Sequence, residues 1–285
     1  MKRLWRIILA AVVVVIILLA IALLLIDQIA RGATERGVSY ATGVPTTLQS
    51  MDVSLLAGQV EMSNMVLANP ADFTASPFLI RTGSFDVAVD AGSLFGQTIR
   101  VKHFILDGLE LNIEQHLKGS NVSTVVDNLK RLGGPREEKP PSGKKVRVDQ
   151  VQVRNVVARF YLPAELGRTG PVEVLLPEIQ LNDVASDESG VAIAELTRRL
   201  LAAVLAAVAQ KAQGVVPPEV LALLNSNVGE LTTAIGAKAV ELVNQARDEA
   251  MGRVGEQATE AIEKGKETLE QETRDRIKGL FDKPK

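Results

Sequence analysis

The pattern of apolar and polar residues divides the chain into three stretches. Residues 7–26 form an unbroken apolar run. Between residues 49 and 181 apolar and polar positions mostly alternate, the period of two expected for strands with one face in water. From Val191 onward apolar residues recur three and four positions apart, as on one side of a helix. We therefore expect an α+β protein with an N-terminal transmembrane helix, a β-rich middle and C-terminal helices.

The alternating stretch predicts about eight strands in a curved, mostly antiparallel sheet, for which a groove-like shape stays open. The first two form a hairpin around the turn at Leu56–Gly58. Pro177 cannot donate a backbone hydrogen bond, so the last strand is expected at an edge or with a bulge. The expected strands cover residues 49–55, 60–67, 84–90, 99–106, 109–114, 146–153, 155–162 and 172–181.

One side of these strands is apolar and is the candidate contact surface of the protein. The simpler interpretation is that other elements cover it as core. In the loop at 67–80, Asn69 and Pro70 end a strand, and two phenylalanines are expected to fold under the loop and cap the apolar face. The candidate residues are Val53, Leu55, Phe73, Phe78, Phe85, Val87, Val89, Ile99, Val101, Leu109, Leu111 and Ile113.

Helical segments interrupt and follow the strands. Residues 121–132 read as a short amphipathic helix that Asn121 caps, and Asn121 also begins a glycosylation triplet. Residues 133–145 are a charged, flexible loop. An amphipathic helix within 186–216 is expected on or near the sheet. Pro218 suits the first turn of the next helix. Residues 217–285 read as a long charged helical tail with a thin apolar stripe, suited to self-association or to a partner helix.

The apolar run has the length and flanks of a membrane anchor. Its twenty residues from Ile7 to Ile26 would extend about 30 Å as a helix, the thickness of a bilayer core. Lys2, Arg3 and Arg6 precede it, so the positive-inside rule places residues 1–6 in the cytoplasm and the rest of the chain outside. A cleaved signal peptide would have a shorter apolar region of about 7–15 residues.

The residues that could carry chemistry are few. The formal net charge of −2 argues against nucleic acid as a partner, and the chain contains no cysteine. Its two histidines, His103 and His116, lie thirteen positions apart without a motif that binds metal. No nucleophile elbow, phosphate-binding loop or dinucleotide fingerprint occurs. We predict a non-enzymatic protein with no catalytic residue, metal site or cofactor.

A series of short motifs resembles one known family. The series begins where the apolar run meets Asp27 and continues to a helix at Val191. Its members are Gly43-Val-Pro45, Val53-Ser-Leu-Leu-Ala-Gly58, Val66-Leu-Ala-Asn-Pro70, Phe73, Leu79, Ser93-Leu94, Ile99 and Leu176-Pro-Glu-Ile-Gln-Leu181. In this order they resemble the N-terminal region of the AsmA-like proteins of Gram-negative envelopes. The resemblance covers residues 4–210 and leaves out the tail from Pro217.

The resemblance implies a location and a role. AsmA-like proteins, related to TamB, are anchored in the inner membrane and expose a β-rich part to the periplasm, where a groove with an apolar lining is thought to move phospholipid or support outer-membrane assembly. The candidate apolar residues would then contact acyl chains. The alternative is a structural scaffold with a closed β core, whose tail associates with itself or with a partner helix. With about eight strands the sheet is ~40 Å wide, too short for a bridge between membranes.

Overall fold

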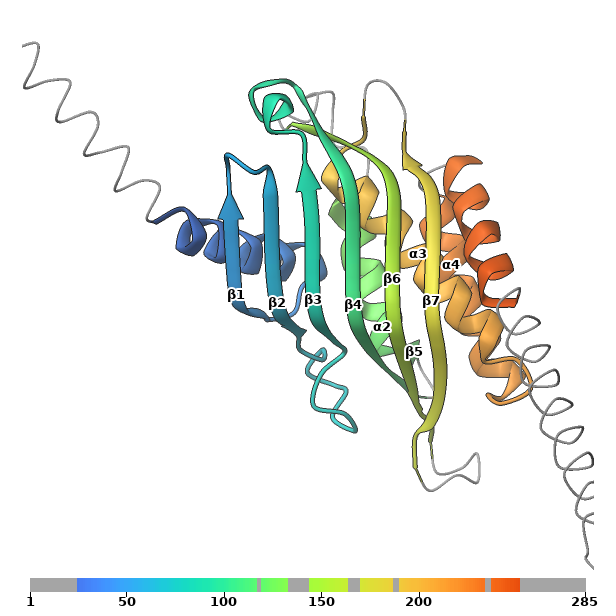
Figure 1. Ribbon diagram of the computed structural model, residues 1–285. Coiled ribbons are helices and arrows are strands. Elements are labelled where there is room, and N and C mark those ends of the chain that lie inside the picture. Colours follow the sequence, from blue (N-terminus) through green and yellow to red (C-terminus); the bar gives the residue numbers. More distant parts are fainter. Residues whose placement is uncertain are drawn as a thin grey trace, which may run out of the picture.

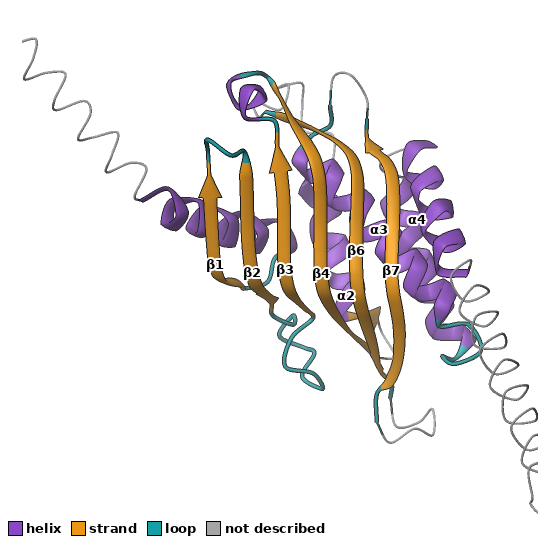
Figure 2. Cartoon of the chain, in the orientation of Figure 1, coloured by secondary structure: helices purple, strands orange, loops and turns teal. Residues whose placement is uncertain are grey.

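The computed structural model describes residues 25–116, 119–132, 144–163, 170–186, 190–233 and 237–251. Segment 1–6, nearly all of the apolar run 7–26, most of the charged loop and the tail beyond residue 251 therefore lie outside the described residues. Within the described ranges, every helix is too short or too polar to cross a bilayer. The protein is α+β: helices gather on one side of an open mixed sheet (Figures 1 and 2).

The sheet begins as an antiparallel meander and contains one parallel pair of neighbouring strands. Strands β1 (Thr46–Ser54), β2 (Gln59–Leu67), β3 (Ile80–Val89) and β4 (Thr98–His116) lie side by side in chain order. The short β5 (Gly119–Ser120) and helix α2 (Asn121–Leu132) follow β4. They carry the chain back, so β6 (Lys145–Tyr161) pairs with β4 in parallel. Strand β7 (Val172–Ala185) then pairs antiparallel with β6 and ends the sheet.

In each of the six long strands, the alternation between side chains that face the helices and side chains that face away shifts by one residue. The shift occurs at the same level of the sheet in every strand. We call these positions the switch row, and pairing registers place them opposite one another. Three of them have positive φ, a backbone conformation that glycine and asparagine adopt most easily. On both sides of the row, buried side chains remain in the same core. The switch row consists of Gln49, Asn64, Gly83, Gly108, Asn155 and Pro177.

The switch row explains why the expected count of eight strands is wrong. Gly108, with φ of 73°, lies inside the continuous strand β4, and Asn155, with φ of 52°, lies inside β6. In the sequence, the shift of the alternation at Gly108 and at Asn155 looks like a turn between two short strands. The structure therefore has seven strands among the described residues, β5 included, and two of them are much longer than predicted.

Three C-terminal helices follow the sheet, and α3 packs directly on it. The predicted helix within 186–216 is confirmed as α3 (Ile193–Lys211), and α4 (Pro218–Thr233) begins at the predicted proline. Alanines allow α3 to approach the sheet closely, and Ala203, Ala206 and Ala207 are fully buried. Helix α4 packs on α3, and residues 237–251 form a further helix. Leu231 and Leu242, which the sequence places in a long tail, are core residues.

A helix over residues 25–42 protects the first edge of the sheet. Its side chains accept hydrogen bonds from the outer backbone N–H groups of β1. Asp27 Oδ1 accepts from Val53 N at 2.9 Å, and Glu35 Oε1 accepts from Leu48 N at 2.8 Å. Ser39 Oγ accepts from Thr46 N at 2.8 Å. An edge strand with these groups satisfied is a poor template for another strand.

Candidate functional site

Two adjacent rows of apolar side chains cross the whole sheet. Both lie on the side that faces the helices, between the switch row and the end of the sheet that carries the β1–β2 turn. Strand pairing places Val53, Val60, Val87, Phe104, Val151 and Leu181 in the first row. It places Met51, Met62, Phe85, Leu106, Val153 and Ile179 in the second. The face is therefore apolar from one edge to the other.

Exposure falls along both rows from β1 to β7. In the first row Val151 and Leu181 are fully buried, whereas its members on β1 to β4 are only half-buried. In the second row Ile179 is fully buried, and Met51 and Met62 are half-buried. We call the half-buried part of the two rows the open corner. It consists of Met51, Val53, Val60, Met62, Val87 and Phe104.

The position of the helices causes this gradient. Helix α3 packs on β6 and β7, and α2 packs on β4 (Figure 1). At the other edge, helix 25–42 follows β1, and Thr34 Oγ1 lies 3.8 Å from Met51 Sδ. The open corner lies between these two covers. Phe104 meets Phe85 edge to face, with ring centroids 5.9 Å apart, which orders the floor of the open corner.

The opposite side of the sheet is charged. Arg159 on β6 binds Glu110 on β4 at 2.7 Å and Glu173 on β7 at 2.9 Å. The hydrogen bond with Glu110, and then that with Glu173, raises the pKa of Arg159. Arg81 lies 3.9 Å from the other oxygen of Glu110. Such a ladder of charges belongs in water, so a candidate apolar contact surface can lie only on the helix side.

The structure distributes the predicted apolar residues over three environments. Phe78, Leu109, Leu111 and Ile113 are at most 5% exposed and contact only protein. Phe85, Val89 and Val101 are also buried, with 7–8% exposure. The members that keep exposed surface are Val53, Leu55, Phe73, Val87 and Ile99. Of the twelve, Val53 and Val87 belong to the open corner.

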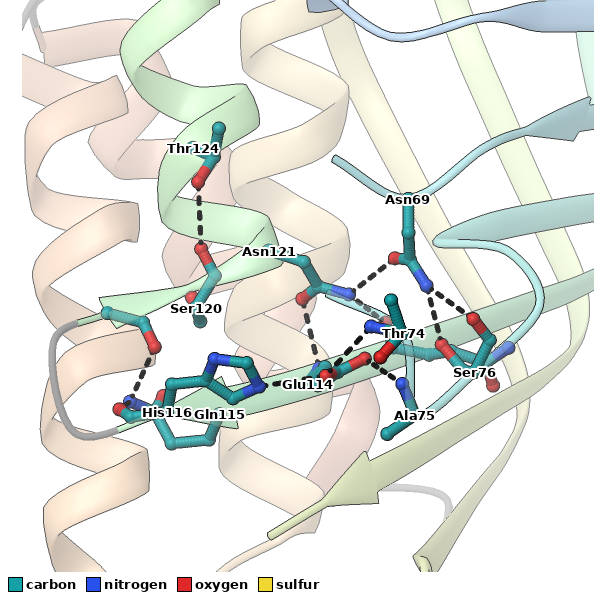
Figure 3. Close-up of polar contacts among 12 residues, drawn as sticks. Asn69, Thr74, Ala75, Ser76, Glu114, Gln115, His116, Ser120, Asn121 and Thr124 are labelled. Carbon is teal, nitrogen blue, oxygen red and sulfur yellow. Dashed lines mark hydrogen bonds and ion pairs between the residues drawn. The ribbon is translucent and has the colours of Figure 1, made fainter. Parts of the chain in front are cut away.

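Phe73 and Phe78 lie in a loop that a buried polar network fixes (Figure 3). The Glu114 side chain is 3% exposed, and its two oxygens accept from Thr74 N at 3.2 Å and Ala75 N at 2.8 Å. His116 Nε2 lies 2.8 Å from Glu114 Oε1, and the Phe73 ring lies 4.7 Å from the His116 ring. The arrangement holds the loop against β4, which is a packing role for Phe73.

Asn121 is the centre of the same network rather than the helix cap. Its amide donates to Asn69 Oδ1 at 2.9 Å and to Asn112 O at 2.8 Å, and its oxygen accepts from Glu114 N at 3.0 Å (Figure 3). Ser120 Oγ instead accepts from Ser123 N, the bond typical of an N-cap. Since Asn121 is fully buried, it is no acceptor for a glycan in the folded protein.

The two histidines have separate partners. His103 Nε2 lies 2.8 Å from Asp86 Oδ1 on the charged side of the sheet, and His116 pairs with Glu114. Both belong to β4, thirteen positions apart, which is about 40 Å along a strand. In the described ranges, the acidic and histidine side chains form no group of three that could hold a metal ion.

Comparisons with known proteins give no family for this chain. A scan against protein-family models finds no match, and a search of curated proteins finds no relative. The resemblance to AsmA-like proteins therefore stays a hypothesis, and the functional argument depends on the apolar face itself.

Sequence reasoning missed most of the open corner. Met51, Val60, Met62 and Phe104 are absent from the predicted set, although the first three stand between polar neighbours. The signal that would find them is strand pairing: once 53 is opposite 60, the same register places 62 opposite 51. Glu114 was also missed, because nothing in the sequence distinguishes a buried carboxylate from a solvated one.

Proposed function

We propose that this chain is a non-enzymatic membrane-anchored protein that holds acyl chains of phospholipid on the open corner of its sheet. The anchor is the apolar run 7–26, and the described domain lies on the outer side of an inner membrane. In this role the protein supports phospholipid transport or assembly of the envelope. The observation that carries the proposal is the pair of apolar rows, buried under α3 at one edge and half-exposed near β1.

The size of the open corner restricts what it could hold. Its six side chains come from β1, β2, β3 and β4, which span about 15 Å at ~4.8 Å per strand. A surface of this width accommodates part of one lipid rather than a file of lipids. The proposal is therefore a short module that receives or presents lipid beside the membrane. Helix α3 occupies the rest of the face, so the apolar rows offer no continuous path to β7.

Photocrosslinking tests the proposal at neighbouring residues with opposite orientations. Phe104 and Ile105 are both half-buried, but Phe104 belongs to the open corner and Ile105 pairs with Asp86 and Gln152 on the charged side. Each is replaced in the full chain by benzoylphenylalanine, which is close in shape to Phe104. After irradiation in native membranes, we expect a phospholipid adduct at 104 and little at 105.

Two results would contradict lipid binding at the open corner. One is an equal yield of lipid adduct at 104 and 105, and the other is no adduct at 104 in a folded variant. Circular dichroism and resistance to proteolysis check the fold. Because both probes sit in the domain, lipids that merely surround the anchor do not affect the comparison.

A second candidate function, the scaffold, is favoured by the outer surface of the C-terminal helices. Val240 and Met251 are 48% and 55% exposed and lie eleven residues, or about three turns, apart on one face of helix 237–251. Leu223 on α4 is 42% exposed. A partner helix or a second copy would cover these side chains. Sedimentation of the full chain against Val240→Ser/Met251→Ser tests this, with a loss of association as the expected result.

A further inference from the structure

Exposed apolar side chains gather where the chain enters the described domain. Leu56 in the β1–β2 turn is fully exposed, and Leu55 is 39% exposed. On helix 25–42, Leu25 and Ile29 are 42% and 64% exposed. They are four positions apart, so they lie on one side of that helix. We call these four residues the tip patch.

A hydrogen bond joins the two parts of the tip patch. Asp27 Oδ1 accepts from Val53 N at 2.9 Å, so the start of helix 25–42 lies against the last residues of β1. Leu56 follows Val53 by three residues, which limits their separation to about 10 Å. The turn is itself held in place, since Gly58 O accepts from Val89 N at 2.6 Å. The exposed leucines of the turn are therefore held close to Asp27, the residue that directly follows the apolar run.

Positive charge lies at the same end of the sheet. Arg100, Lys102, Lys144 and Lys145 are exposed; three of them belong to the beginning of β4 and of β6, and Lys144 directly precedes β6. Backbone bonds connect this region to the turn: Asp90 N donates to Arg100 O at 2.8 Å, and Lys145 N donates to Gln97 O at 3.0 Å. Asp52, Glu61 and Asp90 are the acidic residues nearest in sequence to the turn and to the short 3₁₀ helix η1 (Ala91–Phe95).

We propose that the tip patch is a membrane-contact surface that enters the interface of the same bilayer that holds residues 7–26. The proposal rests on the anchoring proposed above, but not on lipid binding at the open corner. Exposed apolar side chains together with Lys and Arg at one end of a domain are the combination that binds an anionic bilayer surface. With the anchor and the turn both in the membrane, the domain has a fixed orientation. The open corner, which begins at Val53, then starts at the membrane surface.

A fluorescence experiment on the full chain measures the depth of the turn. The chain has no cysteine, so a single one can be introduced and labelled with an environment-sensitive dye. Ala57→Cys reports on the turn beside Leu56, and Ala71→Cys is the matched control, an exposed alanine in the loop at the opposite end of the sheet. Each is reconstituted into vesicles of phosphatidylethanolamine and phosphatidylglycerol. Alkaline carbonate extraction shows separately whether the anchor is inserted.

The proposal predicts opposite behaviour of the two labels. The dye at 57 should be quenched several-fold more by a nitroxide on the lipid than the dye at 71, and iodide should quench it less. Leu55→Ser/Leu56→Ser should return the dye at 57 to water without releasing the chain from the vesicles. Leaving out phosphatidylglycerol should reduce the difference, since the cations assist the contact.

Two different failures can be told apart. If the chain resists carbonate but the dye at 57 is as accessible to iodide as the dye at 71, the membrane-contact surface is wrong and the anchor stands. If carbonate releases the chain, the anchoring part of the proposed function is wrong, and the membrane-contact proposal, which rests on it, is wrong as well.

Discussion

One apolar face crosses the whole sheet of this protein, and its two ends differ in what covers them. Under α3, the side chains of β6 and β7 are sealed by alanines that bring the helix close to the sheet. In the open corner, side chains of the same chemistry and in the same rows keep part of their surface exposed. The difference does not lie in the strands, which alternate equally well at both ends. It lies in where the helices pack, so the strand pattern alone does not separate buried core from half-exposed surface.

The largest expected difference in stability comes from the same substitution made in the exposed and in the covered part of one row. Val151 is fully buried and Val60 is half-buried, and pairing places both in the first apolar row. Val151→Ala removes buried methyl groups and leaves a cavity, so we expect a loss of about 2–3 kcal/mol in the free energy of unfolding. Val60→Ala should cost less than about 1 kcal/mol. Urea denaturation measures both, and equal losses would show that the open corner is closed in solution.

The next effect tests the polar network that closes the other end of the face. Glu114→Gln keeps the shape of a buried carboxylate but places an amide N–H₂ where Thr74 N, Ala75 N or His116 needs an acceptor. Leaving a buried group without a partner costs about 1–3 kcal/mol. Glu110→Gln, in the partly exposed ion pairs of the charged side, is the control and should cost less than about 1 kcal/mol. Similar values for both would mean that the loop at 67–80 does not depend on Glu114.

On β1 to β4, the switch row lies between the open corner and the covered side chains at the other end of these strands. A substitution at Gly108 tests the backbone of the switch row. Gly108→Ala places a side chain at φ of 73°, where its Cβ would meet Gly83 at 3.4 Å. The strain of a left-handed residue is about 1–2 kcal/mol, and thermal unfolding should show a loss of that order. Asn155→Gly at φ of 52° is the control, with a change within about 0.5 kcal/mol. A neutral Gly108→Ala would mean that the strand straightens without cost.

Much of this organisation was predictable, and the failures have physical causes. The α+β class, the helix at 193–211 and the helix start at Pro218 follow from period and turn chemistry. The strand count failed at Gly108 and Asn155, because a positive φ inside a strand imitates a turn. In the candidate surface, burial of Leu109, Leu111 and Ile113 depends on packing by elements distant in the chain, which periodicity does not contain. Val60 and Phe104 required the strand register.

The smallest effect concerns the edge of the open corner, where side chains of helix 25–42 accept hydrogen bonds from the backbone of β1. Leu48 N donates to Glu35 Oε1, and this bond, helped by Arg31, holds the pKa of Glu35 below its ordinary value of 4.5. A carboxylate whose pKa is lowered by folding stabilises the folded state above its unfolded pKa and loses that contribution as the pH falls through the folded value. Because Glu35 is partly exposed, the contribution is at most about 1 kcal/mol.

Glu35→Gln therefore should remove a small pH dependence rather than a large part of the stability. Below pH 4.5, where the unfolded carboxyl takes up its proton, the wild type should lose stability more steeply than the variant. Chemical denaturation at a series of pH values measures the two slopes, and Asp52→Asn, an exposed residue of β1, is the control. Parallel curves for wild type and Glu35→Gln would show that the helix covers the edge without this bond, and that its packing alone sets the boundary of the open corner.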